Sequence, residues 1–430
     1  MNRIRTTALL LSTILGSVIV SLAQQPPPPT TAPFRLKDGD TAVFYGDSIT
    51  EQRLYTADIE NFVLTRFPGL HVRFVNSGVG GDKVSGGWAG PIDLRLRRDV
   101  LAYHPAMVTV MLGMNDGYYR PFDEGILTTY TLGYRYLVEQ IQSALPQNSI
   151  TLLKPSPYDD VTREPEYGSG YNATMVRFGD FVEKLAVERH TLLADLNQPI
   201  VEALTAAKTA DPVLSTALIR DRVHPGPAIH LLMAEVVLKS WNAPAVVTFA
   251  RIDASRGKVS AATNTDISQL QRTKDGLTWV QSDRALPLPF AAAESDPCTD
   301  LVLHVADLNE RLNQEMLRID GLSEQLYELQ IDGRSLGTFT AAQLEAGINL
   351  ATLDTPMFAQ ARLVAFDTAQ KNDLENSRFS IANDTRDTKT EELVKRLDSA
   401  IGRVVERQHK DAQPIAHRYA LLRASKVGTK

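Results

Sequence analysis

The residues best suited to covalent chemistry are Gly46-Asp47-Ser48, which directly follow a short hydrophobic segment with the composition of a β-strand. A serine at a strand-to-helix turn places its hydroxyl at the carboxyl edge of a sheet, next to the positive end of the following helix. Gly46 permits the tight backbone of such a turn. Because Asp-Ser before a helix is also ordinary capping chemistry, these residues alone leave a nucleophile and a helix cap as alternatives.

Two further polar segments follow later strand candidates. The glycine-rich residues 76–82 (NSGVGGD) expose backbone N–H groups that can hold an anion. A plain flexible loop and a nucleotide-binding turn are the alternatives, but the spacing is not GxGxxG and no Walker lysine pattern follows. Gly113-Met114-Asn115-Asp116 can present the Asn115 amide N–H groups at the same sheet edge. An Asx turn that merely ends the strand is the alternative there.

A candidate base lies in Asp221-Arg222-Val223-His224, just before a proline and a helical pattern. Residues three apart in a turn or helix can approach each other. The Asp221 carboxylate can then accept a hydrogen bond from one imidazole nitrogen of His224 and leave the other nitrogen to take a proton. A lone histidine is more often structural than catalytic, and the other histidines of the chain have no comparable carboxylate partner in a motif.

Together and in this order, the four segments resemble the SGNH hydrolase family, also called GDSL esterases or lipases, over about residues 40–242. The motifs of that family are a GDS serine, a glycine in a glycine-rich loop, an asparagine in GxND, and a DxxH near the end of the domain. Gly81 is the better match for the oxyanion glycine because it directly precedes Asp82, and Gly78 is the less favoured register.

The resemblance implies acyl transfer through a covalent intermediate. It makes Ser48 the nucleophile, His224 the base and Asp221 the residue that orients the base. The backbone N–H groups of Ser48 and Gly81 and the Asn115 side chain would form the oxyanion hole. No metal or other cofactor is expected, because the sequence has no His, Asp, Glu and Cys cluster with metal-ligand spacing.

These segments need a parallel sheet to bring them together. Residues 38–245 alternate strand-like and helix-like segments, which predicts βαβ crossovers and a sheet covered on both faces. We therefore predict a catalytic domain of flavodoxin-like three-layer α/β/α architecture with a five-stranded parallel sheet. The expected strands are residues 41–45, 71–76, 107–112, 149–154 and 191–196, and the expected helices are residues 55–67, 91–103, 128–144, 172–190 and 225–241.

From about residue 245 the pattern changes to short β-type segments. We predict a smaller β-rich accessory domain at residues 246–385, with Asp332-Gly333 as a hairpin turn. Residues 386–430 are interpreted as a helical tail, because residues 389–409 are charged and amphipathic. This half has no motif to which we assign chemistry. Its strand candidates are residues 246–252, 277–281, 301–305, 326–331 and 336–339, and its helix candidates are residues 341–346 and 356–369.

The N-terminal residues indicate export. Two arginines precede an apolar stretch and a small-x-small cleavage signal, so residues 1–23 are interpreted as a signal peptide cleaved after Ala23. The proline-rich residues 24–37 are interpreted as a linker. An uncleaved membrane anchor is the alternative, although the apolar stretch is short for a span. The expected address is periplasmic or extracellular. The single cysteine, Cys298, can form no internal disulfide, which fits a chain with an adequate core.

Composition restricts the partners. At 430 residues, two domains are the default expectation, and the core can be large without a disulfide or metal. A net charge of −6 argues against nucleic acid or an anionic membrane surface as the main partner. No stable membrane span is expected after processing, and the oligomeric state is left open.

The substrate class is open between sugar esters and lipid esters. Tyr118, Tyr119 and Arg120 lie beside the expected oxyanion site, and Trp88 follows the glycine-rich segment. Flat rings near a site suit sugar faces, although aromatics also simply fill gaps. We favour a small-molecule or polysaccharide ester with a short acyl group such as acetyl. The alternatives are a lipid-directed esterase, lysophospholipase or thioesterase, and a catalytically silent binding protein.

Overall fold

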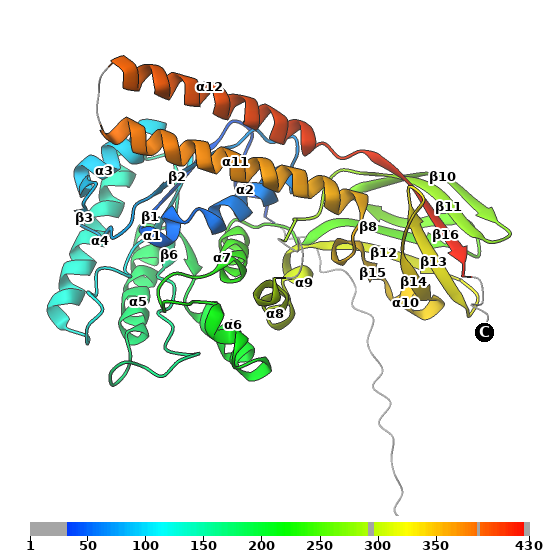
Figure 1. Ribbon diagram of the computed structural model, residues 1–430, viewed down its shortest axis with the longest axis horizontal. Helices are drawn as coiled ribbons and strands as arrows, with labels where there is room; N and C mark the ends of the chain where they lie inside the picture. The colour runs from blue at the N-terminus through cyan, green and yellow to red at the C-terminus, as the bar shows by residue number, and fades with distance from the viewer. Residues whose placement is uncertain (1–31, 291–295, 385–387, 425–430) are drawn as a thin grey trace, which may run out of the picture.

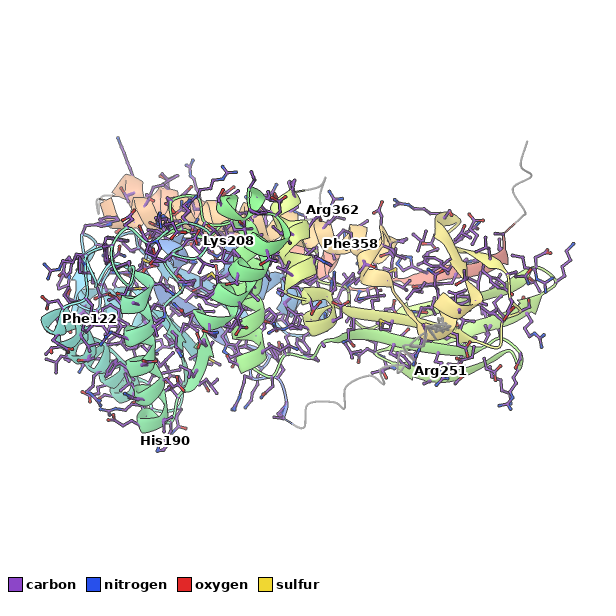
Figure 2. All side chains as sticks on the ribbon, turned by 90° about the horizontal axis from the view of Figure 1, so that it is seen from below. Phe122, His190, Lys208, Arg251, Phe358 and Arg362 are labelled. Atoms are coloured by element: carbon purple, nitrogen blue, oxygen red, sulfur yellow. The ribbon has the colours of Figure 1, made fainter. Side chains whose placement is uncertain are left out.

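The computed structural model describes residues 32–290, 296–384 and 388–424. The predicted signal peptide and residues 24–31 of the predicted linker lie outside these ranges. In the described part of the chain, no helix is long and apolar enough to cross a membrane. The molecule is elongated, with the first half (residues 32–245) at one end and the antiparallel sheets of the second half (residues 246–424) at the other, while the long helices of residues 356–411 extend back along the first half (Figure 1). Figure 2 shows Phe122 and His190 at the first end and Arg251 in the second half.

The first half is built on a five-stranded parallel sheet in the order β2-β1-β5-β6-β7. Gly46 of β1 pairs with both Gly78 of β2 and Met111 of β5, so these three strands end together at one edge. This result confirms the expected flavodoxin-like sheet, whose order reverses beside β1. The strands are β1 (Thr41–Gly46), β2 (Arg73–Gly78), β5 (Met107–Met111), β6 (Ser149–Lys154) and β7 (Leu192–Asp195).

Helices cover both faces of this sheet. α2 lies on one face, where it packs against α7, and α3, α4 and α5 pack side by side on the other face. Tyr130 and Tyr134 tie α4 to the sheet by donating to main-chain carbonyls at the end of β5. The single-turn α1 and the longer α6 are additional to the expected helices. The helices are α1 (Ser48–Glu51), α2 (Leu54–Arg66), α3 (Ile92–Asp99), α4 (Glu124–Ala144), α5 (Asn172–Arg189), α6 (Gln198–Ala210) and α7 (Pro227–Ser240).

The second half contains two sheets, in the orders β10-β11-β16-β13-β14 and β15-β12-β8-β9. Buried side chains of both sheets form one core, so the sheets pack face to face. The expected turn at Asp332-Gly333 joins β13 to β14, and both residues have positive φ, as such two-residue turns require. The strands are β8 (Val246–Asp253), β9 (Lys258–Thr263), β10 (Thr265–Thr273), β11 (Gly276–Asp283), β12 (Gln314–Asp320), β13 (Leu326–Ile331), β14 (Arg334–Thr340), β15 (Ile348–Asn349) and β16 (Ala416–Arg423).

One predicted strand is wrong. Residues 301–305 belong to helix α8 (Pro297–Val305), which Asp296 caps by accepting from the backbone N–H groups of Cys298 and Thr299. A short apolar run does not distinguish a strand from a buried helix, and here the cap and Pro297 in the first turn favour the helix. The core of the first half includes side chains of α8 and of the next helix, α9 (Leu308–Leu312). Burial raises the pKa of the Cys298 thiol.

The C-terminal region differs from a simple helical tail. The helix expected at residues 389–409 is α12 (Thr388–Asp411), and it forms a hairpin with α11 (Pro356–Asp384), which is longer than expected (Figure 1). Residues 416–423, which we expected in the tail, form β16, the middle strand of the five-stranded sheet of the second half. Alternating buried side chains, including His417, Tyr419 and Leu421, fit this strand.

The hairpin is attached to the first half by a buried ion pair. The Lys371 ammonium on α11 lies 2.9 and 3.0 Å from the two carboxylate oxygens of Glu60 on α2. Gln408 on α12 donates to the same carboxylate at 3.2 Å. Burial raises the pKa of Glu60, although Lys371 opposes this effect. Glu60 therefore depends on the hairpin for its counter-charge.

Replacing Lys371 by methionine is expected to lower the free energy of unfolding by about 3–5 kcal/mol, because it leaves a buried carboxylate without its cation. The loss should grow as pH rises. An unpaired buried carboxyl has a higher pKa than in the unfolded chain, so the folded state binds more protons and loses stability with increasing pH. Urea unfolding at pH 5 and pH 8 measures both effects.

The matched control is Arg396→Met, which removes an exposed ion pair with Glu392 on α12. It should change the stability by less than about 1 kcal/mol at either pH. Equal losses in the two variants would contradict a structural role for the buried pair.

Candidate active site

Ser48 is the first residue of α1 and directly follows β1 and Asp47. The Asp47 carboxylate caps the helix by accepting from the backbone N–H of Ile49 at 3.0 Å. Capping and a free serine hydroxyl therefore coexist, because Asp47 and not Ser48 supplies the cap. Gly46 is required for space: a Cβ there would lie 2.8 Å from the Met111 carbonyl oxygen.

A hydrogen-bonded chain joins Ser48 to the predicted base. The Ser48 Oγ lies 2.8 Å from His224 Nε2, and His224 Nδ1 lies 2.7 Å from Asp221 Oδ2. Since a carboxylate only accepts, Nδ1 carries the proton and Nε2 is left to accept from the serine. Partial burial acts to raise the pKa of Asp221, but hydrogen bonds from the His224 backbone and ring and from the Val223 backbone lower it overall. Asp221 is therefore ionised at neutral pH.

The turn that carries Asp221 and His224 is held by Arg222. This residue has φ +69°, and its guanidinium donates to the carbonyl oxygens of Asp159 and Glu164 at 3.1 and 2.9 Å. The backbone N–H of Asp159 donates in return to the Arg222 carbonyl at 2.8 Å. The loop between β6 and α5 thus positions the turn. Sequence reasoning missed this role, because the partners lie about sixty residues away and form no motif.

The glycine-rich turn packs directly against the nucleophile. A Cβ on Gly78 would lie 2.6 Å from the Thr50 carbonyl carbon, and one on Gly80 would lie 3.9 Å from Ser48 Cβ. Gly81 has φ +75°, a conformation that glycine adopts readily. The Asn115 side-chain amide donates to the carbonyl oxygen of the next residue, Asp82, at 3.1 Å. The predicted oxyanion residues therefore meet at one sheet edge.

The four predicted substrate-binding residues differ in what they contact. Trp88, between the two-residue strands β3 (Gly86–Gly87) and β4 (Gly90–Pro91), is 75% exposed, and its indole N–H donates to the Gly80 carbonyl at 2.8 Å. Tyr118 is 54% exposed, and the Lys83 ammonium lies over its ring. The exposed Arg120 guanidinium also lies over the Tyr118 ring. The Tyr119 hydroxyl instead donates to Asn115 Oδ1 at 2.9 Å.

Three buried carboxyl groups lie behind these residues. Burial raises the pKa of Asp47 and of Asp116 to about 7. Asp82 is paired at 2.8 Å with the fully buried guanidinium of Arg95, which also donates to the Ser77 carbonyl. Arg95 thus supports the strand end and the glycine-rich turn from below. No local sequence signal identified Arg95, since the pattern of α3 is that of an ordinary amphipathic helix.

The described residues show a large cavity in another place. It has a volume of about 700 Å³ and lies between β2, α2 and the α11–α12 hairpin, with Arg53, Tyr103 and Phe379 among its lining residues. It includes none of the predicted site residues. Within the described ranges, no group of three or more His, Cys, Asp or Glu side chains is placed to hold a metal ion.

The chain is similar to known esterases over its first half. Residues 44–232 match the GDSL-like Lipase/Acylhydrolase family, as the four segments predicted. An acetylxylan esterase of Geobacillus stearothermophilus is 28% identical over 226 residues, which are 48% of this chain and 95% of that protein. A crystal structure of the acetylxylan esterase Axe2 from the same organism covers 48% of this chain and 96% of its own, with a TM-score of 0.40.

A second solved structure resembles nearly the whole molecule. It is that of a gut microbial diltiazem-metabolizing enzyme, 24% identical, with a TM-score of 0.80 over 92% of this chain and 100% of that chain. This likeness shows that the combined fold of both halves recurs in another protein.

Gly78→Ala is expected to reduce kcat/KM by about a hundredfold or more, or to prevent folding, because the new methyl group overlaps the backbone of α1 and displaces Ser48. Gly69→Ala is the control, since a Cβ there meets nothing within 4 Å. Ester hydrolysis and thermal unfolding of both variants test this expectation. Wild-type activity in a folded Gly78→Ala variant would show that the close approach is not needed.

Proposed function

We propose that this chain, a carboxylic ester hydrolase whose residues 44–232 match the GDSL-like Lipase/Acylhydrolase family, removes short acyl groups from carbohydrates. The observation that carries the proposed chemistry is the hydrogen-bonded chain from Ser48 through His224 to Asp221. The similarity to an acetylxylan esterase supports the proposed substrate class.

In the proposed mechanism, neutral His224 accepts the Ser48 proton as Oγ attacks the ester carbonyl carbon. Asp221 keeps the imidazole oriented and stabilises its charged form. When the tetrahedral intermediate collapses, the imidazolium returns the proton to the departing alcohol oxygen, and the acyl group remains on Ser48. A water molecule that gives a proton to His224 then attacks the acyl-enzyme carbonyl. As the Ser48–acyl bond breaks, the imidazolium returns that proton to Ser48 Oγ, and the carboxylic acid is released.

We propose that the predicted oxyanion hole binds the negatively charged carbonyl oxygen of the tetrahedral intermediate. Its donors are the backbone N–H groups of Ser48 and Gly81 and one side-chain N–H of Asn115. Such donors stabilise the transition state because they are already in place when the charge develops, and losing one typically raises the barrier by about 3–4 kcal/mol.

Exposed aromatic residues support a carbohydrate as the alcohol part of the substrate. Trp88 is three-quarters exposed yet held to the glycine-rich turn by its indole N–H, and Tyr118 and Arg120 lie exposed on the loop after Asn115. A flat ring that is fixed in place and open to water offers a stacking surface for a sugar face. We assign these three side chains to the rim that contacts the sugar.

We also propose that the enzyme is exported. The motivation is the charged and apolar N-terminal sequence that ends in Ser21-Leu22-Ala23, and a polysaccharide substrate lies outside the cytoplasm.

Ser48→Ala and His224→Ala are each expected to lower kcat by at least about a thousandfold, because the nucleophile and the base act as a unit. Hydrolysis of p-nitrophenyl acetate measures this loss. His190→Asn is the control: this histidine ends α5 with φ +55°, which asparagine tolerates, and it lies at the molecule's surface (Figure 2). A Ser48→Ala variant that kept a tenth of the activity would rule out Ser48 as nucleophile.

The acyl pocket is expected to be small, so p-nitrophenyl acetate and butyrate should be hydrolysed far faster than decanoate or palmitate. A long lipid groove would instead gain about 0.8 kcal/mol for each methylene that fits. Acetate should also be released from acetylated xylan, and Trp88→Ala should slow that reaction more than p-nitrophenyl acetate hydrolysis. A preference for chains of eight carbons or more would favour a lipid-directed esterase.

Export predicts a mature protein that begins at Gln24 or within a few residues of it. Mass spectrometry of the protein recovered from the periplasm or medium of an expressing bacterium identifies this end. Intact Met1 in a membrane fraction would instead indicate an uncleaved anchor.

A further inference from the structure

The amide of Asn115 needs a defined orientation to act in an oxyanion hole. An asparagine side chain has an oxygen and an NH₂ group of similar shape, so a half-turn places an acceptor where a donor is needed. One N–H of Asn115 donates to the Asp82 carbonyl at 3.1 Å, which leaves the second N–H available. Its Oδ1 accepts from the Tyr119 hydroxyl at 2.9 Å.

From this geometry we propose that Tyr119 is a positioning residue, which holds the Asn115 amide with its free N–H directed at the oxyanion. The proposal rests on the proposed function, because it assumes that Asn115 stabilises the transition state. Reversing the amide would oppose Oδ1 to the Asp82 carbonyl, acceptor to acceptor, and would oppose NH₂ to the Tyr119 hydroxyl. The Asp82 carbonyl, which can only accept, therefore selects the orientation, and the Tyr119 hydroxyl, by donating to Oδ1, holds the side chain in it. This role replaces the direct substrate contact expected for Tyr119.

The backbone after Asn115 is folded so that Tyr119 can reach back to it. Tyr118 and Tyr119 have φ of +56° and +53°, and two successive bulky residues in this left-handed region are unusual. The backbone N–H of Tyr118 donates to the Asn115 carbonyl at 3.3 Å and closes the turn. Strained backbone of this kind persists where the surrounding contacts impose it.

Tyr171 supplies such contacts from the start of α5. Its hydroxyl donates to the Met114 carbonyl at 2.6 Å, and its ring centre lies 5.1 Å from that of Tyr119. The ring also packs on Gly117, where a Cβ would lie 2.8 Å from Tyr171 Cε2. Tyr171 thus braces the backbone of the Asn115 turn, and Tyr119 braces the Asn115 side chain.

The Tyr119 hydroxyl is suited to donating and not to proton transfer. Burial, with smaller contributions from Asp47 and Asp221, raises its pKa to about 12, so it remains protonated at neutral pH. A protonated phenol is a permanent donor to Oδ1.

The test is a double-mutant cycle of Tyr119→Phe and Asn115→Ala, measured as kcat and KM for p-nitrophenyl acetate. Tyr119→Phe keeps the ring and its packing and removes only the hydroxyl. We expect kcat to fall about three- to tenfold with KM changed less than twofold, as for the loss of one hydrogen bond that acts in the transition state. In the Asn115→Ala background, Tyr119→Phe should have almost no further effect.

Tyr136→Phe is the matched control, because Tyr136 is also a partly exposed tyrosine whose hydroxyl donates to a side chain, Asp93, at 2.7 Å. It lies on α4, is assigned no role in the site, and should leave kcat unchanged. Thermal unfolding of all variants confirms that they fold alike.

Two results would overturn the proposal. A higher KM with unchanged kcat would make Tyr119 a direct substrate contact, and an equal effect of Tyr119→Phe with and without Asn115 would show that it does not act through Asn115. These outcomes leave the proposed function intact as long as Ser48→Ala is inactive. Full activity in Asn115→Ala would remove the assumed oxyanion role and the positioning role together.

Discussion

The close contact between the ends of β1 and β2 and the single-turn helix α1 is the constraint on which the candidate site depends. No side-chain atom fits between Gly78 and the backbone of Thr50 and Glu51, and none fits between Gly46 and Met111. The Asn76 side chain closes the same junction by donating to the Thr50 carbonyl at 2.7 Å. Because this packing fixes where α1 begins, it fixes the position of the Ser48 hydroxyl. Only when Ser48 is in this position do the glycine-rich turn and His224 contact it.

Buried carboxyl groups surround this junction, and their negative charge is reduced in two ways. Arg95 compensates Asp82 beneath the glycine-rich turn, while burial raises the pKa of Asp47 and Asp116 towards the neutral form. An ionised carboxylate with no partner would be costly in such a place. Fewer full negative charges near Ser48 also suit a site in which negative charge must develop on a substrate oxygen.

The α11–α12 hairpin extends this network to the other end of the chain. Lys371 is the counter-charge of buried Glu60, and Glu375 lies 3.6 Å from the Arg53 guanidinium, at the residue that links α1 to α2. After α12, β16 returns the chain to the middle of the five-stranded sheet of the second half. The second half is therefore connected to the first through helices that pack on α2, and the predicted catalytic residues all come from the first half.

The sequence by itself determined the local chemistry and the kind of sheet that presents it. Strand and helix periods predicted the five-stranded parallel sheet, and the three-residue spacing of Asp221 and His224 predicted their contact, because both depend on neighbours along the chain. Local pattern failed for residues 301–305 and 416–423. A short apolar run suits a strand or a buried helix equally, so the Asp296 cap and Pro297 had to be weighed at residues 301–305, while residues 416–423 follow a strand-like alternation that was placed in the helical tail.

Tertiary structure alone decided the contacts between distant segments. These include the 2.8 Å contact of Ser48 with His224 and the hydrogen bonds from Arg222 to the loop after β6. They also include the ion pair of Lys371 with Glu60 and the hydrogen bonds of Tyr119 and Tyr171 to the Asn115 turn. Sequence spacing carries no information on such pairs, since their separation along the chain is unrelated to their distance in space. They form because a buried polar group must find a partner, and the packing of the whole chain determines which partner is within reach.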